Sequence, residues 1–442
     1  MTARDLAIEA LVRVDDGAFS NLLLPTLLRG SGLDGRDRAF ATDLVYSTLR
    51  QQRALDHLLT PLLTRPVDGL DPDARAALRV GAYQLVAGVA PHAAVGETVT
   101  AIGRRNPRAK GFVNAVLRRL AATGPPWLLP TGDDVQSVAI RTSHPDWIAA
   151  RLIADLGVDD AVAVLESDNR PPAVTLRANP HRTDPTRLAG ELDAAGIRVE
   201  PGELLGDALT VTGIGDPAAL PAVAEGRATP QDQASQAVVL ALDPQPGDRV
   251  LEIAAAPGGK TTGIAERVGT DGRIGCVVGL DVNPGRVARI KEAAARLGLG
   301  AVHPLVADGR TLPVKPASFD RVLLDAPCSG LGVLRRRPEA RWRIDADAPE
   351  LLAGLQRELL DVAATAVRPG GVLVYSVCTL TAVETLGVDA WAETALADLE
   401  ALPPPGPPWR PHGRGALLLP STAGTDGMFV LRLRARPTPG LG

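Results

Sequence analysis

Two cysteines and three aspartates fall where predicted strands end in the C-terminal half of the chain. Asp281, Asp308 and Asp325 follow successive short apolar runs, and Cys328 and Cys378 come just after two of the strands. Because the carboxyl ends of parallel strands meet at one edge of a sheet, we expect these side chains around a common ligand site. A thiolate there can add to an electrophilic ring carbon, and a carboxylate can accept hydrogen bonds from ribose hydroxyls or a ring amine.

A turn of small residues precedes these positions. The strand Val250 to Ile253 runs into the turn Ala254 to Gly259, and a helix is expected to begin near Lys260. Small residues let a ligand approach the backbone, and a helix N-terminus presents unpaired N–H groups. The turn is not a Walker A loop, because Ala254 replaces the opening glycine and Pro257 removes a donor. We therefore expect a nucleotide-like ligand other than a triphosphate, with a plain strand-to-helix connection as the alternative.

A metal site is not predicted. Cys328 and Cys378 have no neighbouring histidine and no CxxC spacing, so they are interpreted as nucleophilic thiols rather than zinc ligands. Cys276 falls inside a predicted strand, where a free cysteine is usually a small buried hydrophobe.

The composition is that of a globular protein with two or three domains. The chain has 442 residues, of which 45% are hydrophobic and 22% charged, and this length exceeds one ordinary core. The sequence has neither an apolar run that could span a membrane nor an apolar signal core, so we expect a cytoplasmic protein with reduced cysteines. The net charge of −4 excludes a uniformly basic nucleic-acid binder but allows local basic patches.

Residues 1–125 are expected to form an all-helical domain. Apolar residues recur at helical spacing over 3–15, 22–28, 36–49, 54–63, 72–87, 93–102 and 111–122. Basic residues cluster late in this region, at Arg104, Arg105, Arg108, Lys110, Arg118 and Arg119. The cluster is either a solvated face or a patch that contacts phosphates, since arginine can bind a phosphate through two hydrogen bonds.

Residues 135–240 are expected to form a small α+β subdomain with a connecting helix. Strands are predicted at 173–178, 197–199 and 208–212, with helices at 184–195 and up to Leu242. Gln231, Asp232 and Gln233 fall where the last helix begins, and we favour capping over a substrate contact for them. His144 precedes a proline at a helix start and is interpreted as structural.

Residues 241–437 alternate between strands and helices. The predicted strands are 250–253, 274–280, 302–306, 321–324, 372–375, 416–419 and 428–433, and the helices begin at 260 and cover 286–297 and 349–367. This alternation predicts an α/β fold with a mostly parallel, doubly wound, Rossmann-like sheet that binds ligands over the carboxyl ends of its strands.

The strand-end residues resemble the Sun/Nop family of S-adenosylmethionine (SAM)-dependent RNA cytosine-C5 methyltransferases. The matching strings are Ala255-Ala-Pro-Gly-Gly-Lys-Thr261, Asp325-Ala-Pro-Cys-Ser-Gly330 and Tyr375-Ser-Val-Cys-Thr379, with Asp281 and Asp308. The helical region resembles a NusB-like RNA-binding domain in Pro91-His-Ala-Ala-Val-Gly-Glu and Gly111-Phe-Val-Asn-Ala-Val-Leu-Arg-Arg. The combination is similar to the RsmB type, which modifies a cytosine of small-subunit (16S) ribosomal RNA.

The resemblance implies a role for each residue. Cys378 is expected to attack carbon 6 of the cytosine, and Cys328 to assist proton removal at carbon 5 and release of the adduct. Asp325 is expected to hold the amino edge of the flipped base beside the cofactor. Asp281 is expected to contact the cofactor's ribose, and Asp308 its adenine. The other expected cofactor contacts are Ala254, Ala255, Ala256, Pro257, Gly258, Gly259, Lys260 and Arg286.

A group of arginines after the Cys328 loop is expected either to hold the RNA backbone or to form a solvated basic loop. These are Arg335, Arg336, Arg337, Arg341 and Arg343. The expected cofactor is SAM, and the expected partner is small-subunit ribosomal RNA. We expect the protein to be a monomer that neither binds a metal nor associates with a membrane.

Two positions and one segment depart from the family pattern. Ala254 stands where many members have cysteine, and Glu252 where many have aspartate. The segment after the second cysteine matches weakly, which leaves the role of Glu384 open. Two alternatives also remain open: the same chemistry on transfer RNA, and an inactive NusB-type RNA-binding assembly factor.

Overall fold

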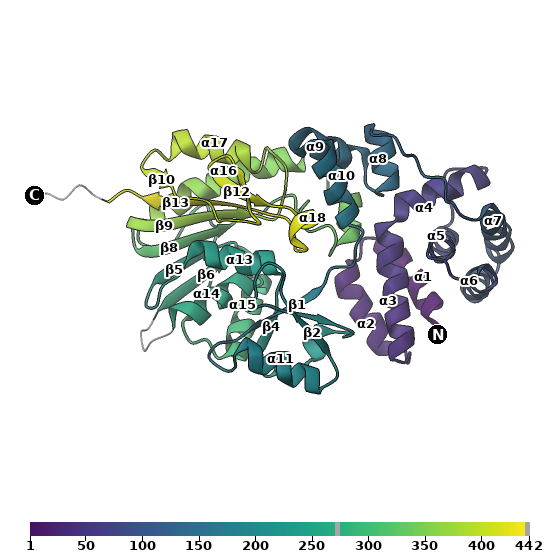
Figure 1. Ribbon diagram of the computed structural model, residues 1–442, viewed down its shortest axis with the longest axis horizontal. Coiled ribbons are helices and arrows are strands. Elements are labelled where there is room, and N and C mark those ends of the chain that lie inside the picture. Colours follow the sequence, from purple (N-terminus) through teal and green to yellow (C-terminus); the bar gives the residue numbers. More distant parts are fainter. Residues whose placement is uncertain (270–274, 438–442) are drawn as a thin grey trace, which may run out of the picture. The chain divides into compact units, whose positions relative to one another are not determined.

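A computed structural model describes residues 1–269 and 275–437 and contains two compact units, whose elements are labelled in Figure 1. The first unit holds Met1–Pro171 together with Leu334–Ile344, and the second holds Pro172–Val333 and the described residues from Asp345 onward. Among the described residues, no helix combines the length and the apolar character needed to cross a membrane.

The first unit is all-helical. Its helices are α1 (Ala3–Asp15), α2 (Ser20–Gly30), α3 (Gly35–Arg50), α4 (Gln52–Leu59), α5 (Pro72–Val86), α6 (Pro91–Arg105), α7 (Lys110–Thr123), α8 (Val135–Arg141), α9 (Asp146–Leu156) and α10 (Val158–Ser167), with 3-10 turns η1 (Thr60–Leu62), η2 (Val67–Gly69) and η4 (Pro338–Trp342). Local signals set the helix starts: Thr2 and Asp5 form a capping box on α1, and Asp71 caps α5 ahead of Pro72. The seven helices predicted in residues 1–125 are confirmed to within a few residues. By their contacts, α8 to α10 group with this unit, whereas the sequence analysis grouped residues 135–240 together.

The second unit begins with a small antiparallel sheet in the order β2-β3-β1-β4. Its strands are β1 (Val174–Ala178), β2 (Arg198–Pro201), β3 (Leu209–Thr212) and β4 (Ala228–Pro230), with α11 (Pro185–Ala194), η3 (Pro217–Ala219) and α12 (Pro221–Ala224). The predicted strands and helix are confirmed. The strand β4 was not predicted, because three residues are too few to show an alternation of apolar and polar side chains.

The large sheet has the order β11-β12-β13-β9-β8-β5-β6-β7, and β10 pairs with β13. Its strands are β5 (Arg249–Ile253), β6 (Cys276–Asp281), β7 (Val302–Val306), β8 (Phe319–Asp325), β9 (Val367–Val377), β10 (Leu399–Ala401), β11 (Arg410–His412), β12 (Gly415–Leu418) and β13 (Met428–Ala435). The strands β5 to β9 pair in parallel, and β13 pairs antiparallel with β9 and continues through antiparallel β12 and β11. The predicted start of one strand at Ile274 lies outside the described residues.

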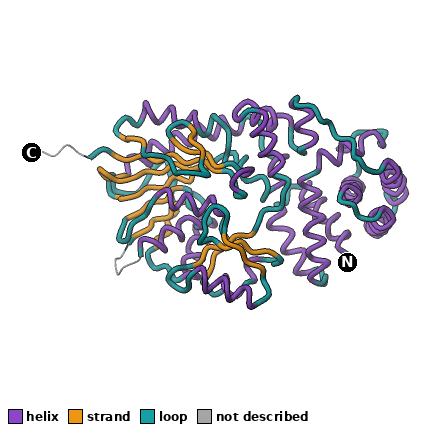
Figure 2. The backbone as a smooth tube through the Cα atoms, viewed as in Figure 1, coloured by secondary structure: helices purple, strands orange, loops and turns teal. Residues whose placement is uncertain are grey.

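Helices cover both faces of the large sheet (Figures 1 and 2). They are α13 (Gln233–Leu242), α14 (Gly259–Val268), α15 (Pro284–Leu297), α16 (Ala348–Ala366) and α17 (Leu386–Ala395), with the short α18 (Pro420–Ala423) before β13. In Figure 1, α13, α14 and α15 lie along one face, and α16 and α17 along the other. The central strands are therefore buried on both sides, which explains their unbroken apolar runs. This is the predicted doubly wound α/β fold, with the carboxyl ends of its parallel strands free for a site.

Candidate active site

The small-residue turn after β5 is held tightly between neighbouring elements. The Ala255 N–H donates to the Leu280 carbonyl at the end of β6, at 2.8 Å. Gly258 has a φ of +99° and is the N-cap of α14, and a Cβ added to it would lie 3.1 Å from the Ile290 Cα. Ala254 has a φ of +59°, a left-handed conformation that costs a residue with a Cβ about 1 kcal/mol. The turn thus keeps the first N–H groups of α14 close to the end of β5.

A partly buried ion pair connects this turn to the end of β8. The Lys260 Nζ lies 2.6 Å from Asp325 Oδ2, and the Ser376 Oγ donates to Asp325 Oδ1 at 2.8 Å. Burial by itself lowers the pKa of Lys260, but the carboxylates of Asp325 and Glu252 outweigh it, so that the net shift is upward. Lys260 is therefore a fixed positive charge at the carboxyl end of the sheet.

Glu252 lies beneath the same turn. It is 1% exposed, and it accepts a hydrogen bond from the Thr261 Oγ1 at 2.6 Å. Burial raises the pKa of Glu252 to about 8, against the effects of that hydrogen bond and of Lys260. At neutral pH this side chain is mostly a neutral acid, so Lys260 directs its charge mainly at Asp325.

The two cysteines predicted to act together are adjacent. The Sγ atoms of Cys328 and Cys378 are 3.4 Å apart, and both residues are partly exposed. The hydrogen bond from Cys328 and then the ammonium of Lys260 lower the pKa of Cys378, against burial and nearby carboxylates. The hydrogen bond to Cys378, burial, and the charges of Cys378 and Glu384 raise the pKa of Cys328 well above its usual range. The surroundings therefore favour a thiolate at Cys378 and a thiol at Cys328.

Backbone contacts fix the loops that carry these sulfur atoms. The Gly332 N–H donates to the Cys378 carbonyl at 3.0 Å, and the Gly427 N–H donates to the Gly332 carbonyl at 2.7 Å. A Cβ added to Gly332 would lie 2.5 Å from the Gly427 carbonyl oxygen. Only glycine fits at Gly332, because the loop after β8 packs directly on the backbones of its neighbours.

The acids predicted to contact the cofactor's ribose and adenine lie at the ends of β6 and β7. Asp281 is 4% exposed, and its Oδ1 accepts the Asn283 N–H at 2.9 Å. Asp308 is more exposed, and its two oxygens accept hydrogen bonds from the Arg310 side chain, which lower the pKa of Asp308 to about 2. Arg286 is exposed in the first turn of α15.

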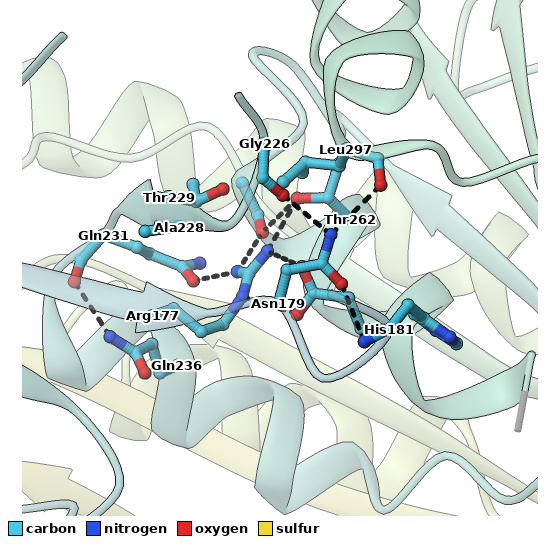
Figure 3. Close-up of polar contacts among 12 residues, drawn as sticks. Arg177, Asn179, His181, Gly226, Ala228, Thr229, Gln231, Gln236, Thr262 and Leu297 are labelled. Carbon is cyan, nitrogen blue, oxygen red and sulfur yellow. Dashed lines mark hydrogen bonds and ion pairs between the residues drawn. The ribbon is translucent and has the colours of Figure 1, made fainter. Parts of the chain in front are cut away.

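Arg177, which was not predicted as a site residue, forms hydrogen bonds with the start of α14 (Figure 3). It lies on β1, and its guanidinium donates to the Gly259 carbonyl at 2.9 Å and to the Thr262 Oγ1 at 2.9 Å. It also donates to both carboxylate oxygens of Glu266, at 2.8 and 2.9 Å, and to Gln231. The small sheet is thereby attached to the start of α14. Gln231 was predicted to cap a helix, but Asp232 is the cap of α13.

A groove of about 770 Å³ opens beside this network, between β1, α13 and α14. Its charged lining includes Arg177, Glu266, Asp184, Asp207 and Asp243. None of the predicted cofactor residues lines it, so the groove is distinct from the strand-end site.

The basic residues predicted to contact RNA in the helical unit differ in their interactions within the protein. Arg104 pairs with Asp5 at 2.8 Å, and Arg105 pairs with Asp73. Arg119 donates to a backbone carbonyl at 3.2 Å. Three further residues are exposed and present their charges to solvent, namely Arg108, Lys110 and Arg118.

The arginines that follow the Cys328 loop belong to the helical unit. Arg341 is 0% exposed and donates to the Arg50 and Ser143 carbonyls, at 3.2 and 3.0 Å. Arg343 donates to backbone carbonyls at the end of α1 and after it. Arg335 is 6% exposed. The predicted RNA-backbone contact is therefore wrong for Arg335 and Arg341, whose charges are turned inward.

In the same segment, two neighbouring arginines retain access to solvent. Arg336 is half-buried and Arg337 is exposed. For these two residues the contact with the RNA backbone stays a prediction.

Comparison with known proteins gives matches over the whole chain. The family described as 16S rRNA methyltransferase RsmB/F matches residues 239–434, the NusB family matches residues 1–122, and a ferredoxin-like domain of the RsmF/B-like methyltransferases matches residues 144–216. The probable ribosomal RNA small subunit methyltransferase B of Bacillus subtilis is 35% identical over 98% of this chain and 99% of its own. Ribosomal RNA small subunit methyltransferase B of Thermus thermophilus is 39% identical over 98% of each chain. The crystal structure of PH0851 superposes with a TM-score of 0.83 at 27% identity, over 98% of this chain and 99% of that one.

Proposed function

The chain belongs to the RsmB/F family of 16S rRNA methyltransferases, and from this premise we propose that it methylates carbon 5 of a cytosine through a covalent adduct on Cys378. The family and the fold are those of SAM-dependent enzymes that act on ribosomal RNA. The observation that carries the proposal is the 3.4 Å separation of the Cys328 and Cys378 sulfur atoms, next to the ion pair of Lys260 and Asp325.

The turn after β5 fits a nucleotide-type cofactor. Gly258 packs against α15, where a side chain would meet Ile290, and the N-terminus of α14 supplies N–H groups beside the turn. Ala254 to Lys260 would hold the methionine part of SAM, Asp281 the ribose and Asp308 the adenine, with Arg286 near the cofactor. When bound, SAM supplies an electrophilic methyl group. The chain's own residues must make the cytosine able to accept it.

Carbon 5 of cytosine is a poor nucleophile until carbon 6 is saturated. Addition of the Cys378 thiolate to carbon 6 forms a sulfur–carbon bond and gives carbon 5 the character of an enamine. Lys260 favours this step because it stabilises the thiolate of Cys378. We assign Asp325, which is held by Lys260 and Ser376, to the amino edge of the flipped base.

The second half of the reaction removes the proton from carbon 5, after which the sulfur–carbon bond breaks and Cys378 leaves as a thiolate. Two causes of the raised pKa of Cys328 are its hydrogen bond to Cys378 and the charge of that residue. Both effects end once Cys378 is a thioether. Cys328 can then lose its own proton more easily, and we assign it to the removal of the carbon 5 proton.

The remaining assignments follow from the substrate. Residues 1–125 are assigned to RNA binding, residues 135–240 to a small RNA-binding subdomain with its connecting helix, and residues 241–437 to methyl transfer. The exposed basic residues Arg108, Lys110 and Arg118 are assigned to phosphate contacts. Because the proposed substrate is ribosomal RNA, we propose that the enzyme acts in the cytoplasm, and that it acts as a monomer.

The test is methyl transfer from labelled SAM to 16S ribosomal RNA, free or in small subunits, by the full chain and three cysteine variants. We expect Cys378→Ala to abolish turnover and Cys328→Ala to accumulate an RNA–protein adduct that resists denaturant. Cys276→Ala is the control and should match the wild type, because this residue lies at the start of β6. Normal methylation by both Cys378→Ala and Cys328→Ala would contradict the assigned roles, and methylation of transfer RNA alone would contradict the substrate.

A further inference from the structure

Glu384 is a buried carboxylate between β9 and α17, six residues after Cys378. It is 0% exposed. Its oxygens accept hydrogen bonds from five donors: Ser329 N at 2.8 Å, Ser329 Oγ at 2.5 Å, Thr379 Oγ1 at 3.0 Å, Thr381 Oγ1 at 2.9 Å and Gln356 Nε2 at 3.0 Å. All five donors are neutral groups, and together they saturate the acceptor capacity of a carboxylate.

The donors come from both cysteine loops. Ser329 follows Cys328 directly, and Thr379 follows Cys378 directly. The hydroxyl oxygens of Ser329 and Thr379 lie 2.8 Å apart on the same carboxylate. Glu384 therefore joins the residue next to one sulfur atom to the residue next to the other.

Helix α16 supports the same connection from one side. Gln356 donates from its Nε2 to Glu384 and also to the Pro327 carbonyl, at 2.9 Å, just before Cys328. Tyr375, on β9, places its hydroxyl 2.7 Å from the Glu384 carbonyl. The carboxylate thus stands at the centre of a buried polar network whose members flank both thiols but do not include them.

On the basis of the function proposed above, we propose that Glu384 is a positioning residue that clamps the two cysteine loops together. The clamp sets the separation of the Cys328 and Cys378 sulfur atoms. It acts through Ser329 and Thr379 and touches neither the base nor the cofactor. The clamp matters mainly for the second half of the reaction, because Cys328 must then reach the proton on carbon 5.

A carboxylate suits this position better than an amide. Each of its oxygens accepts hydrogen bonds, and bonds to a charged acceptor are stronger than bonds between neutral groups. A glutamine would turn an NH₂ group toward some of the five donors, so at least one of them would lose its partner. Glu384→Gln therefore loosens the clamp while almost preserving the side-chain volume.

The first measurement of the clamp needs no RNA. The full-length wild type and Glu384→Gln are treated with diamide, and the rate of disulfide formation between Cys328 and Cys378 is followed by mass spectrometry. Diamide takes up the two electrons and two protons that the thiols release. We expect the variant to form this disulfide about 10-fold more slowly, because one thiolate first adds to diamide and the second must then reach that sulfur to displace the reduced reagent.

The second measurement is of steady-state methylation and of adduct formation on unmodified 16S ribosomal RNA. A misplacement of about 1 Å can cost about 100-fold in rate, so we expect kcat of Glu384→Gln to fall by about 10- to 100-fold. The KM for SAM should stay unchanged, and a denaturant-resistant adduct should accumulate as in Cys328→Ala. Ser329→Ala removes one donor and should show the same pattern in a milder form, which keeps the test valid if Glu384→Gln folds poorly.

Glu339→Gln is the matched control. Glu339 is 3% exposed and accepts the Ser20 N–H at 2.9 Å and the Ser20 Oγ at 2.8 Å, the same pair of donors from one serine. It lies in the helical unit. We expect Glu339→Gln to lower the melting temperature to a similar degree without slowing disulfide formation.

The outcomes separate this proposal from the function on which it rests. If Cys328→Ala traps an adduct while Glu384→Gln and Ser329→Ala keep wild-type kcat and disulfide rates, the clamp is wrong and the covalent mechanism stands. If no cysteine variant traps an adduct but Glu384→Gln still slows disulfide formation, the clamp holds and the covalent mechanism is wrong.

Discussion

At the carboxyl end of the large sheet, Lys260 and Arg177 are buried or half-buried and direct their charges at defined acceptors near the turn after β5. In the helical unit, Arg104 and Arg105 are exposed and pair with aspartates at the surface. A buried charge must have its partners within hydrogen-bonding distance, whereas a surface pair contributes only about 0 to 1 kcal/mol. The sheet edge therefore depends on each cation singly, whereas the surface of the helical unit, apart from buried arginines such as Arg341, depends on the sum of many exposed charges.

This contrast also separates what sequence patterns can predict from what they cannot. The position of a residue at a strand end follows from topology, because neighbouring parallel strands finish at the same edge. The acceptor of an arginine depends on which residues the fold brings near it. We therefore expect a single substitution to lower activity strongly at the sheet edge and only slightly on the surface of the helical unit.

Lys260→Met tests the sheet edge and should lower the methylation rate more than the other substitutions in this comparison. Loss of the ammonium leaves Asp325 without its ion partner and removes a cause of the low pKa of Cys378. A higher pKa means less thiolate at neutral pH, so the rate at pH 7 should fall by about 100-fold. The rate should recover in part as the pH is raised, which a pH profile of kcat will show. Lys291→Met, on the exposed face of α15, is the control; an unshifted profile in Lys260→Met would contradict the role of the ammonium.

Arg177→Ala should have an intermediate effect on the cofactor. Without the guanidinium, the Gly259 carbonyl and Glu266 lose their donors and the start of α14 is held less firmly. We expect the dissociation constant for SAM, measured by calorimetry, to rise by about 10-fold, or 1.4 kcal/mol. In Arg296→Ala, the small sheet loses hydrogen bonds to α15 but not to α14, so stability should fall without this change in affinity. Equal affinities in both variants would show that Arg177 serves only the packing of the small sheet.

Single substitutions of exposed basic residues in the helical unit should have the smallest effects, and these should fall on RNA binding. Lys110→Ala and Arg118→Ala each remove an exposed charge, and each is expected to weaken RNA binding a few-fold and to lower the slope of log K against log salt by about 1. Arg104→Ala removes a charge that Asp5 already neutralises and should leave the slope nearly unchanged. Filter binding across a salt series measures all three variants. A steeper loss from Arg104→Ala than from Lys110→Ala would reverse the proposed order.

The residues at the strand ends show which parts of the site can be predicted from the sequence. The doubly wound sheet and the proximity of Cys328 and Cys378 follow from apolar runs and from the residues that end them. The hydrogen bonds of Glu384 to Ser329 and Gln356 could not be predicted, because these donors lie 55 and 28 residues away in the chain. Arg335 and Arg341 were misassigned for the same reason: an arginine-rich string looks like a basic surface until the fold shows which guanidinium groups are buried.

The covalent step is tested most directly with small-subunit ribosomal RNA that contains 5-fluorocytidine. Fluorine on carbon 5 cannot leave as a proton does, so an enzyme that adds to carbon 6 and transfers methyl remains attached to the RNA. After incubation with SAM and digestion, mass spectrometry identifies the modified peptide. We predict one SAM-dependent adduct, on the peptide that carries Cys378. An adduct on Cys328, or no adduct from enzyme that methylates unmodified RNA, would contradict the assignment of the nucleophile.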